Sequence, residues 1–493
     1  MKKILYVSFL FFTLNGFSKK ETSKDTLFVI LDSRPETLDP RKSVSANGMR
    51  MVDLIFDSFI NFDQKGQLKP GLAESWKLEG LTWILKLKAN LKFSNGRPVT
   101  KEDILFSFKE FKNNSHFKHA FKNIESVEIL ENPKNQWTVK VTLKKFQAPF
   151  ISSDLPVLKI LPQKESQLKN FNKFPIGLGS WSVVKNNFRQ ITLKRNSPVF
   201  LSKPQFLSFQ IIRDSFTRTQ KMLSQEMDIA PSVLPLIYLQ KFKDKNFNIY
   251  STAGFSTTYL LLNLKNNVLN QKEVRQALAL AINSKEIIKH KLYDYAVPAF
   301  SFIHPESFFF HPSLKASSFD LEKAKQIIQK LNLKKTPLKL SCSNNSNTRV
   351  KAKVLASQIS QTGLKISVES ADWGTFYKDV GQGAYDIALM RWVGVKDPDI
   401  YRIAFHSENQ APKGRNRSFY SNKNLDTLLE KALRQRDPLK RKLIYNKIQE
   451  IIAENKIVIP LWHDMEISVV KKDIENYKIR ANGDFLSLPF VKK

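Results

Sequence analysis

Residues 71–111 constrain the fold more than any other stretch of this chain. They read GLAESWKLEGLTWILKLKANLKFSNGRPVTKEDILFSFKEF, in which a strand pattern passes directly into a helix pattern. The apolar positions Trp83, Leu85 and Leu87 have a period of two, which is typical of a strand with one buried face. Asn95-Gly96 then predicts a tight turn, because both residue types tolerate positive φ angles.

A capped helix is predicted directly after this turn. Thr100 stands three residues before Asp103, which is the spacing of a capping box. Apolar residues then recur at helical spacing and form one predicted buried face: Ile104, Leu105, Phe108 and Phe111. Strand, turn and helix in this order predict a sheet-and-helix unit in an α/β protein.

Composition indicates a folded chain held by its core. Of 493 residues, 42% are hydrophobic and 11% aromatic, which excludes an intrinsically disordered protein. Cys342 is the only cysteine, so no intrachain disulfide can form. No repeat or flexible linker divides the sequence, since strand and helix patterns alternate along it.

The first 18 residues are predicted to be a secretory signal peptide. Lys2 and Lys3 precede an apolar run at 4–14, and Gly16 and Ser18 are small residues suited to cleavage. The alternative is a membrane anchor, but the run is far shorter than the ~20 residues that a span needs. No cysteine follows the run, so we expect an exported periplasmic protein without a lipid anchor.

The formal net charge of +34 leaves two interpretations open. The cationic residues are scattered, which is typical of a solvated basic surface. They could also attract anionic envelope surfaces or an anionic ligand. Nucleic acid is not an expected partner, because the chain is predicted to be exported and carries no nucleic-acid-binding motif.

No motif for catalysis or metal binding is found in the sequence. The seven histidines form no HExxH pair, and the chain has no GxSxG elbow and no P-loop. Gly177-x-Gly179 lacks the third glycine of a dinucleotide loop. We therefore expect a protein that is not an enzyme and that needs no cofactor and no metal.

Several segments together resemble the extracytoplasmic solute-binding proteins of peptide ABC importers. They include LAESW at 72–76, FSNG at 93–96 and PVTKEDI at 98–104. Similar correspondences are PIGLGSW at 175–181 and VRQALALAIN at 274–283. The resemblance runs from about residue 25 to 480, and the segments occur in the family's order.

The resemblance implies an α/β fold of the two-lobed periplasmic binding protein type (type II, cluster C-like) with an extra subdomain. Lobe I would comprise residues 19–60, 175–262 and 456–493, the extra subdomain 61–174, and lobe II 263–455. The chain would cross a hinge near Leu260–Leu264 and near Asn455–Leu461.

The implied function is that of a receptor which captures peptides or peptide-like solutes and delivers them to an ABC permease, and we expect it to be a monomer. Other relatives of this kind imply alternative cargoes, namely a cell-wall peptide or other anionic solute, a metal chelate or an oligosaccharide. A binding module that serves a sensor is a further alternative.

The expected ligand site centres on the segment from Met390 to Asp399, which resembles the family pattern around its amine-binding aspartate. Val395 stands where that aspartate would fall, so the candidates are Asp397 and Asp399, with Trp392 as a wall. Either carboxylate could instead form an Asx turn. Arg391 could hold an anionic group or could pair with Asp386 or Asp397.

Two further groups of candidates come from lobe I and from the hinge. Ser33 and Arg34 lie in the loop after the first strand, which lines the cleft in relatives. Thr257, Tyr259 and Asn263 lie on the strand that enters the predicted hinge, where Asn263 could equally make a structural hydrogen bond. Trp373 and Tyr377 are predicted to be core residues in preference to pocket walls.

Overall fold

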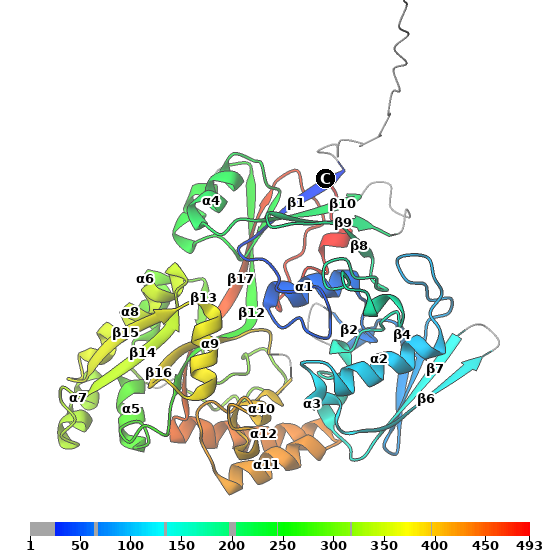
Figure 1. Ribbon diagram of the computed structural model, residues 1–493. Helices are drawn as coiled ribbons and strands as arrows, with labels where there is room; N and C mark the ends of the chain where they lie inside the picture. Colours follow the sequence, from blue (N-terminus) through cyan, green and yellow to red (C-terminus); the bar gives the residue numbers. More distant parts are fainter. Residues whose placement is uncertain are drawn as a thin grey trace, which may run out of the picture.

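The computed structural model describes residues 25–493 except 64–67, 133–135, 197–203, 244, 316–317 and 396. The predicted signal peptide therefore lies outside the described residues. Two lobes and a sheet-bearing subdomain are visible, with lobe I at the top of Figure 1, lobe II at the lower left and the subdomain at the right. This arrangement confirms the expected two-lobed α/β architecture.

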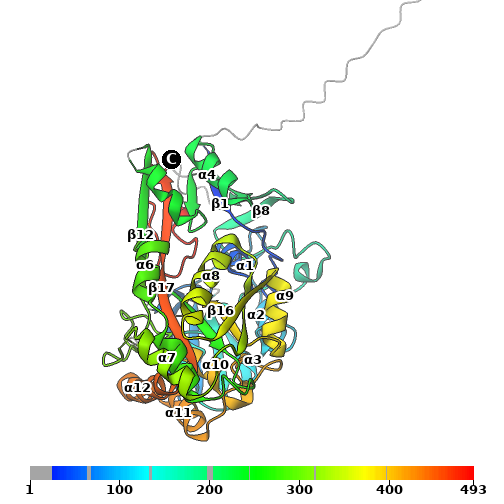
Figure 2. The same cartoon turned by 90° about the vertical axis from the view of Figure 1, so that its left-hand side faces the viewer.

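One large sheet continues through both lobes, in the order β15-β14-β16-β12-β17-β11-β1-β10-β9-β8, with β13 paired to β17. The strands in lobe I are β1 Thr26–Leu31, β8 Trp181–Asn186, β9 Gln190–Arg195, β10 Phe206–Ile211 and β11 Ile229–Pro231. Those in lobe II are β13 Ala296–Pro298, β14 Pro337–Ser343, β15 Lys365–Ala371 and β16 Ile387–Trp392. The long antiparallel pair β12 Phe247–Leu262 and β17 Val458–Lys471 joins the two lobes (Figure 2).

Helices cover this sheet. Lobe I has α1 Ala46–Ile55 and α4 Ser215–Leu223. Lobe II has α5 Lys272–Leu280, α6 Ser284–Lys291, α7 Leu321–Lys330, α8 Ser346–Ser360, α9 Trp373–Gln382, α10 Ile400–Phe405, α11 Lys423–Arg434 and α12 Pro438–Asn455. Short 3-10 turns are η1 Ala148–Phe150, η2 Leu155–Val157, η3 Glu165–Gln167, η4 Leu236–Phe242, η5 Ser407–Asn409 and η6 Leu488–Phe490.

The subdomain has the predicted strand and helix. Its antiparallel sheet has the order β4-β5-β7-β6, and a two-stranded sheet pairs β2 with β3. The strands are β2 Ile60–Phe62, β3 Leu68–Pro70, β4 Ala73–Glu79, β5 Thr82–Leu87, β6 Ile124–Asn132 and β7 Gln136–Leu143; the helices are α2 Lys101–Asn113 and α3 Lys118–Phe121. The alternating residues of β5 are buried as expected. Of the predicted turn pair, only Gly96 has a positive φ, +86°.

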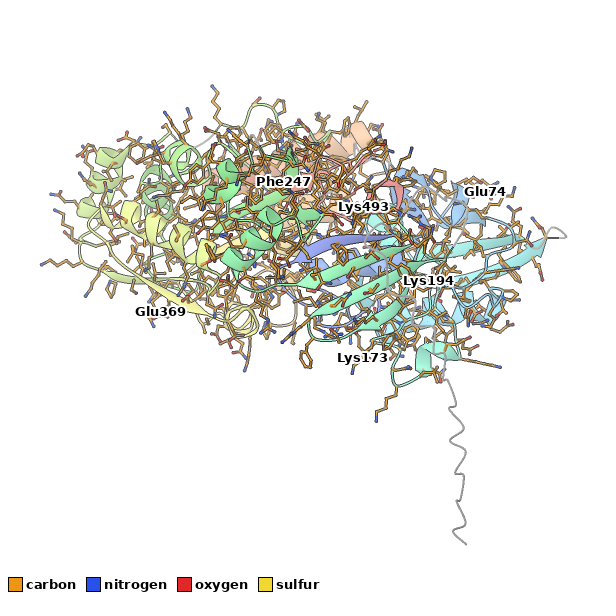
Figure 3. All side chains as sticks on the ribbon, turned by 90° about the horizontal axis from the view of Figure 1, so that it is seen from above. Glu74, Lys173, Lys194, Phe247, Glu369 and Lys493 are labelled. Carbon is orange, nitrogen blue, oxygen red and sulfur yellow. The ribbon has the colours of Figure 1, made fainter. Side chains whose placement is uncertain are left out.

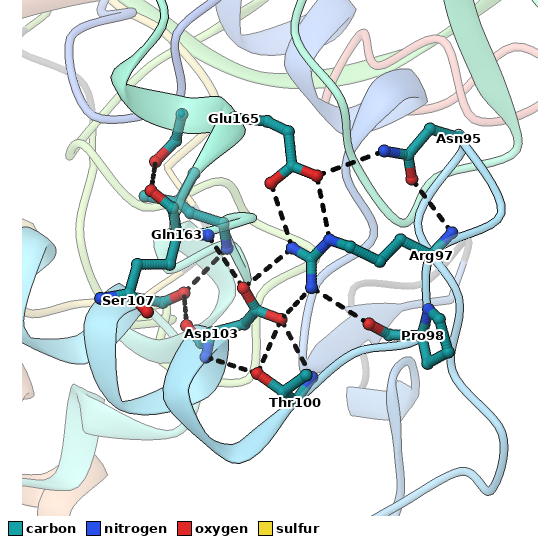
Figure 4. Close-up of polar contacts among 10 residues, drawn as sticks. Asn95, Arg97, Pro98, Thr100, Asp103, Ser107, Gln163 and Glu165 are labelled. Carbon is teal, nitrogen blue, oxygen red and sulfur yellow. Dashed lines mark hydrogen bonds and ion pairs between the residues drawn. The ribbon is translucent and has the colours of Figure 1, made fainter.

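The turn and the capping box are joined by a network around one arginine (Figure 4). The side chain of Thr100 accepts from the backbone N–H of Asp103, and the carboxylate of Asp103 accepts from that of Thr100, which confirms the capping box. Arg97 donates to both carboxylate oxygens of Asp103, at 2.9 and 3.0 Å, and of Glu165, at 2.9 and 3.2 Å. The carboxylate of Asp103 also accepts from the backbone N–H of Gln163 at 2.8 Å. The segment that most resembles the family therefore links the turn at Arg97, the start of α2 and the loop at 163–165 within the subdomain.

Two helix limits differ from those that the sequence predicts. The sequence predicts a first helix near 47–59, but α1 ends at Ile55 because Phe56 takes an extended conformation. Ser284 is the cap that the sequence predicts for α6, but Asn283 caps it by accepting from the N–H of Glu286, and Ser284 is the first helical residue. Asn332 follows a helical pattern and is a residue type that tolerates the left-handed conformation, which it takes with φ of 56°.

The position of the lobe crossing follows from the packing of β12 and β17. Leu260 and Leu461 belong to the core formed with the lobe II helices, whereas Phe247 packs in a lobe I core. The pairing of β12 with β17 shifts register between Ala253 and Ser256. We therefore propose that the chain crosses between the lobes at this irregularity. It lies closer to lobe I than the crossings predicted near Leu260–Leu264 and near Asn455–Leu461.

The cores explain which parts of the molecule are joined. One cluster of buried side chains includes residues of both lobe I and the subdomain, such as Leu27, Phe209, Trp83 and Phe111. Lobe II has two clusters of its own, one on each face of its sheet.

Seen from above, Glu369 of lobe II and Glu74 of the subdomain lie at opposite ends of the molecule, and cationic side chains project around its circumference (Figure 3).

Candidate ligand site between the lobes

A cavity of about 280 Å³ lies where lobe I, the subdomain and lobe II meet. Most of its walls come from three separate parts of the sequence, the loop and helix at 40–53, the loop at 152–159 and the segment at 392–403, and Phe62 and Phe117 complete the lining. The first wall includes Met49, the second Ser152 and Asp154, and the third Trp392 and Ile400. A solute held here would contact both lobes.

Three of the carboxylates in these walls already have cationic partners. The closest ion-pair contacts are Asp53 with Lys159 at 2.8 Å, Asp397 with Arg441 at 2.8 Å, and Asp399 with Arg402 at 2.6 Å. Asp397 and Arg441 are both buried, with side chains 8% and 7% exposed. Burial by itself would lower the pKa of Arg441, but Asp397 outweighs it and raises that pKa well above its usual range. These pairs neutralise most of the charge around the cavity.

Asp154 differs from the other carboxylates of the cavity. No hydrogen bond or ion pair holds its side chain among the described residues of the cavity wall. Burial raises its pKa well above the usual range, and the nearby carboxylate of Asp399 raises it further. The hydroxyl of Ser43, in the same lining, is buried and also lacks a hydrogen-bond partner.

Direct contacts join lobe II to the subdomain. The hydroxyl of Ser152 in the subdomain, in the cavity lining, donates to Oδ2 of Asp397 in lobe II at 2.9 Å. Arg436 of lobe II donates to the carbonyl of Gly80 at 2.7 Å and lies over the ring of Phe146, 4.8 Å from its centroid. Lobe II and the subdomain are therefore held in contact, which is the arrangement of a closed clamp.

A family model described as bacterial extracellular solute-binding proteins, family 5 Middle, matches residues 67–413. The chain belongs to the bacterial extracellular solute-binding proteins, family 5. Proteins of this family are receptors of peptide ABC importers, and the relatives of this chain are binding proteins. Di/tripeptide-binding protein 1 of Pseudomonas aeruginosa (strain UCBPP-PA14) is 26% identical over 495 residues, covering 92% of this chain and 91% of the relative.

Solved structures agree with this assignment. NikZ from Campylobacter jejuni in complex with Ni(L-His) superposes with a TM-score of 0.83 at 26% identity, covering 96% of this chain and 100% of the other. The oligopeptide-binding protein AppA from Bacillus subtilis, in complex with a nonapeptide, has a TM-score of 0.84 at 21% identity, covering 95% and 98%. These likenesses confirm the two-lobed solute-binding fold.

Three predicted residues of this family 5 protein line the cavity, namely Trp392, Asp397 and Asp399. The two aspartates are occupied by the arginines of lobe II, so their role toward a ligand stays a prediction. Asp397 also accepts from the backbone N–H of Asp399 at 2.8 Å, which is the turn geometry that the sequence offered as the alternative. Val395, in the place of the family's aspartate, is buried and contributes an apolar part of the wall.

Arg391 forms ion pairs, but with partners other than the predicted Asp386 and Asp397. Its Nε lies 3.2 Å from Asp464 and its Nη2 lies 3.4 Å from Glu466. Partial desolvation would lower the pKa of Arg391, whose side chain is still 43% exposed, but these two carboxylates raise that pKa overall. The predicted alternative partners are wrong because Arg391 pairs with Thr258 of β12, which in turn pairs with β17, and the side chain contacts Asp464 and Glu466 of β17 across β12.

The remaining predicted site residues lie outside the cavity lining. Ser33 contacts Asn47 and Asp32, and Arg34 donates to Asn186 at 2.7 Å. The hydroxyl of Thr257 contacts Nδ1 of His463 at 2.9 Å, and Tyr259 is buried in lobe II. Asn263 donates to the carbonyls of Gly383 and Tyr385, as the structural alternative predicted. A ligand role for these residues stays a prediction.

Trp373 and Tyr377 do not belong to the core, contrary to the prediction. Their exposed fractions are 56% and 39%, and the two rings lie 5.5 Å apart on the surface of α9. Phe376 between them is the residue that packs inward. Trp373 and Tyr377 lie one helical turn apart whether their face of the helix is buried or exposed. Their spacing therefore did not decide whether they belong to the core.

The sequence reasoning missed Ser43, Asp154 and Lys159. None belongs to a recognisable motif, and Asp154 lies in a loop between two short 3-10 turns. Its only signal is a polar run, Ser152-Ser153-Asp154, enclosed by apolar residues that prove to be buried, Ile151 and Leu155. A half-buried polar run between buried apolar residues is a weak sign of a site facing a cavity.

Proposed function

We propose that this protein captures short peptides or peptide-like solutes in the cavity between its lobes and delivers them to an ABC permease. The observation that carries the proposal is a cavity walled by both lobes. A solute bound there gains contacts that only the closed arrangement offers, so it stabilises the closed form. The names of the dipeptide- and tripeptide-binding relatives support the peptide cargo.

The size of the cavity favours a small cargo. Its volume of about 280 Å³ is just below the roughly 300–1,000 Å³ of typical small-molecule sites. Apolar surface is also available in the lining, where Met49 is 41% exposed and Trp392 forms part of the wall. We therefore expect dipeptides and tripeptides to fit in preference to long oligopeptides.

Isothermal titration calorimetry on protein freed of bound solute by unfolding and refolding tests this proposal. Dipeptides and tripeptides should bind with measurable heat and raise the melting temperature, whereas a nonapeptide should bind weakly or not at all. Small-angle scattering should show no expansion on binding. Absence of heat and of a thermal shift with every peptide would exclude peptides as the cargo.

A metal chelate is a second candidate, favoured by the likeness to NikZ with its bound Ni(L-His). Within the part of the chain that the structure describes, no group of three or more His, Cys, Asp or Glu side chains is arranged to hold a metal ion. A chelate would therefore bind through its amino acid. Titration with nickel in the presence and absence of L-histidine distinguishes this cargo from a peptide.

The anionic-cargo alternative loses its main support. It depended on Arg391 as a free cation, and Arg391 is paired with Asp464 and Glu466.

Among the described residues, no helix is long and apolar enough to cross a bilayer. We propose a periplasmic, monomeric receptor, and size-exclusion chromatography with light scattering tests the monomer.

A further inference from the structure

The strand pair that joins the two lobes contains a bulge. The pairing of β12 with β17 passes from Ala253 directly to Ser256, so that Gly254 and Phe255 are left outside the ladder. A bulge interrupts the hydrogen bonds between two strands and allows the bulged strand to bend. This bulge is therefore the point of β12 at which one lobe can turn relative to the other.

Two carboxylates of β17 lie on opposite sides of this bulge. Asp464 belongs to lobe II, because its side chain accepts from the hydroxyl of Thr258 at 2.6 Å, on the part of β12 that pairs with β16. Glu466 belongs to lobe I, because its Oε2 accepts from the hydroxyl of Ser232, directly after β11, at 2.6 Å. A rotation of the lobes about the bulge would therefore move one carboxylate relative to the other.

Arg391, on β16 in lobe II, contacts both carboxylates. Its Nε lies 3.2 Å from Oδ2 of Asp464, and its Nη2 lies 3.4 Å from Oε1 of Glu466. The first contact lies within lobe II, whereas the second passes the bulge and joins lobe II to lobe I. The charge of Arg50, on α1 of lobe I, also acts on Glu466, but Arg50 would move together with that carboxylate. The contact that changes with the lobe angle is that of Arg391.

The contact between Arg391 and Glu466 favours the closed arrangement. The side chain of Glu466 is only 3% exposed, and a buried carboxylate from which a counter-charge is withdrawn is unfavourable. The side chain of Arg391 is 43% exposed, so water and salt screen part of the attraction. A rotation that opens the lobes at the bulge loses the contact to Glu466 and keeps the one to Asp464. The closed arrangement is thus stabilised before any solute enters.

The bulge is also connected to the cavity wall. Trp392, which follows Arg391 on β16, lines the cavity, and the N–H of Val395 in the same wall donates to the carbonyl of Phe255 at 2.8 Å. The N–H of Phe255 donates in turn to the carbonyl of Ala481 in lobe I at 2.9 Å. Backbone hydrogen bonds therefore connect this wall to both lobes, so a change in the lobe angle also displaces the wall.

We propose that Arg391 is a positioning residue that holds the two lobes closed through Glu466, across the bulge in β12. Arg391 lies outside the cavity lining, so it acts on the solute through the angle between the lobes and not by contact. The apparent affinity for a solute falls in proportion to the fraction of molecules that are competent to bind. This inference rests on the proposed function, since it concerns how readily the lobes enclose a solute.

The test measures the lobe angle and the affinity separately. Arg391→Gln, Glu466→Gln and the double variant are compared with the wild-type protein, and Arg391→Lys restores the charge. Small-angle scattering of the solute-free proteins measures the radius of gyration, and calorimetry with L-Ala-L-Ala and L-Ala-L-Leu measures affinity. Arg434→Gln is the matched control, because Arg434 forms an exposed ion pair with Glu430 within one helix of lobe II.

We expect Arg391→Gln and Glu466→Gln each to increase the radius of gyration of the solute-free protein and to weaken dipeptide binding about five- to twentyfold, the lower range of typical coupling between sites. The double variant should bind no more weakly than the weaker-binding single variant, because both changes remove the same contact. Arg391→Lys should recover part of the affinity, and Arg434→Gln should behave like the wild type. The difference between wild type and Arg391→Gln should shrink between about 0.05 M and about 0.5 M NaCl.

Circular dichroism with thermal unfolding establishes which variants are folded, and Glu466→Gln provides the same test if Arg391→Gln disturbs folding. Folded variants with the scattering and affinity of the wild type would overturn the role of Arg391. Additive effects of the two single changes would overturn it as well, since the residues would then act independently. A wild-type protein that binds neither dipeptide would count against the proposed function, while the scattering of the solute-free variants would still support or overturn the role of Arg391.

Discussion

The buried ion pair between Asp397 and Arg441 allows a quantitative prediction. Both carboxylate oxygens are engaged, at 2.8 and 3.2 Å from the guanidinium nitrogens, and the two side chains are 8% and 7% exposed. At 2.8 Å and an effective dielectric constant of about 20, the attraction is roughly 6 kcal/mol. Desolvation offsets much of it, so removal of either partner alone should cost about 3–5 kcal/mol.

A double-mutant cycle measures this pair. Asp397→Asn leaves Arg441 charged without a counter-ion, and Arg441→Met leaves the carboxylate of Asp397 with only the Ser152 hydroxyl and a backbone N–H. The double variant has neither buried charge and should cost less than the two single changes together, by about 2 kcal/mol or more. Each single variant should lower the melting temperature by roughly 10 °C if lobe II unfolds as a unit of about 200 residues.

The matched control is an exposed pair in the same lobe. Arg434 and Glu430 on α11 lie 3.0 Å apart with side chains 55% and 39% exposed, so Arg434→Met should cost at most about 1 kcal/mol. Urea unfolding followed by circular dichroism provides the free energies. Additive effects of Asp397→Asn and Arg441→Met, or single effects no larger than the control, would refute the argument that this pair is a buried structural element.

Three further predictions concern the lobe junction and the cavity. A Cβ at Gly254 would lie 2.4 Å from the carbonyl oxygen of Asp464, so Gly254→Ala should cost about 1–3 kcal/mol and weaken solute binding, whereas Gly381→Ala, with open space around it, should do neither. Arg436→Ala removes a hydrogen bond between lobe II and the subdomain and should open the molecule in small-angle scattering, with about fivefold weaker binding; unchanged scattering and affinity would contradict this. The pKa of Asp154 is raised in the folded state, so ionisation of this carboxylate destabilises the solute-free protein as the pH rises above the unfolded-state pKa. Asp154→Asn should therefore be more stable than the wild type at pH 7 and equally stable near pH 3. A wild-type protein that is more stable than the variant at pH 7 would be inconsistent with an unpaired carboxylate.

Local elements and their order were predictable from the sequence. The alternation in β5 and the capping box of α2 each depend on residues close together in the chain, so the sequence spacing alone predicts them. The order of these elements also resembled that of one family, and the family and the two-lobed fold were confirmed. The turn at Gly96 and the left-handed Asn332 followed from the conformational preferences of those residues.

The partners of the charged side chains were decided only by the tertiary structure. Arg391, Asp397 and Asp399 all lie in the predicted segment, yet Arg391 pairs with residues about 75 positions away and Asp397 pairs with Arg441. The one carboxylate left without a partner, Asp154, lies in a different part of the chain. An ionised side chain takes whichever counter-charge the folded chain brings within a few ångströms, and sequence spacing contains no information on that distance. Sequence therefore determined the kind of protein, whereas tertiary packing determined which of the charged side chains around its cavity are paired.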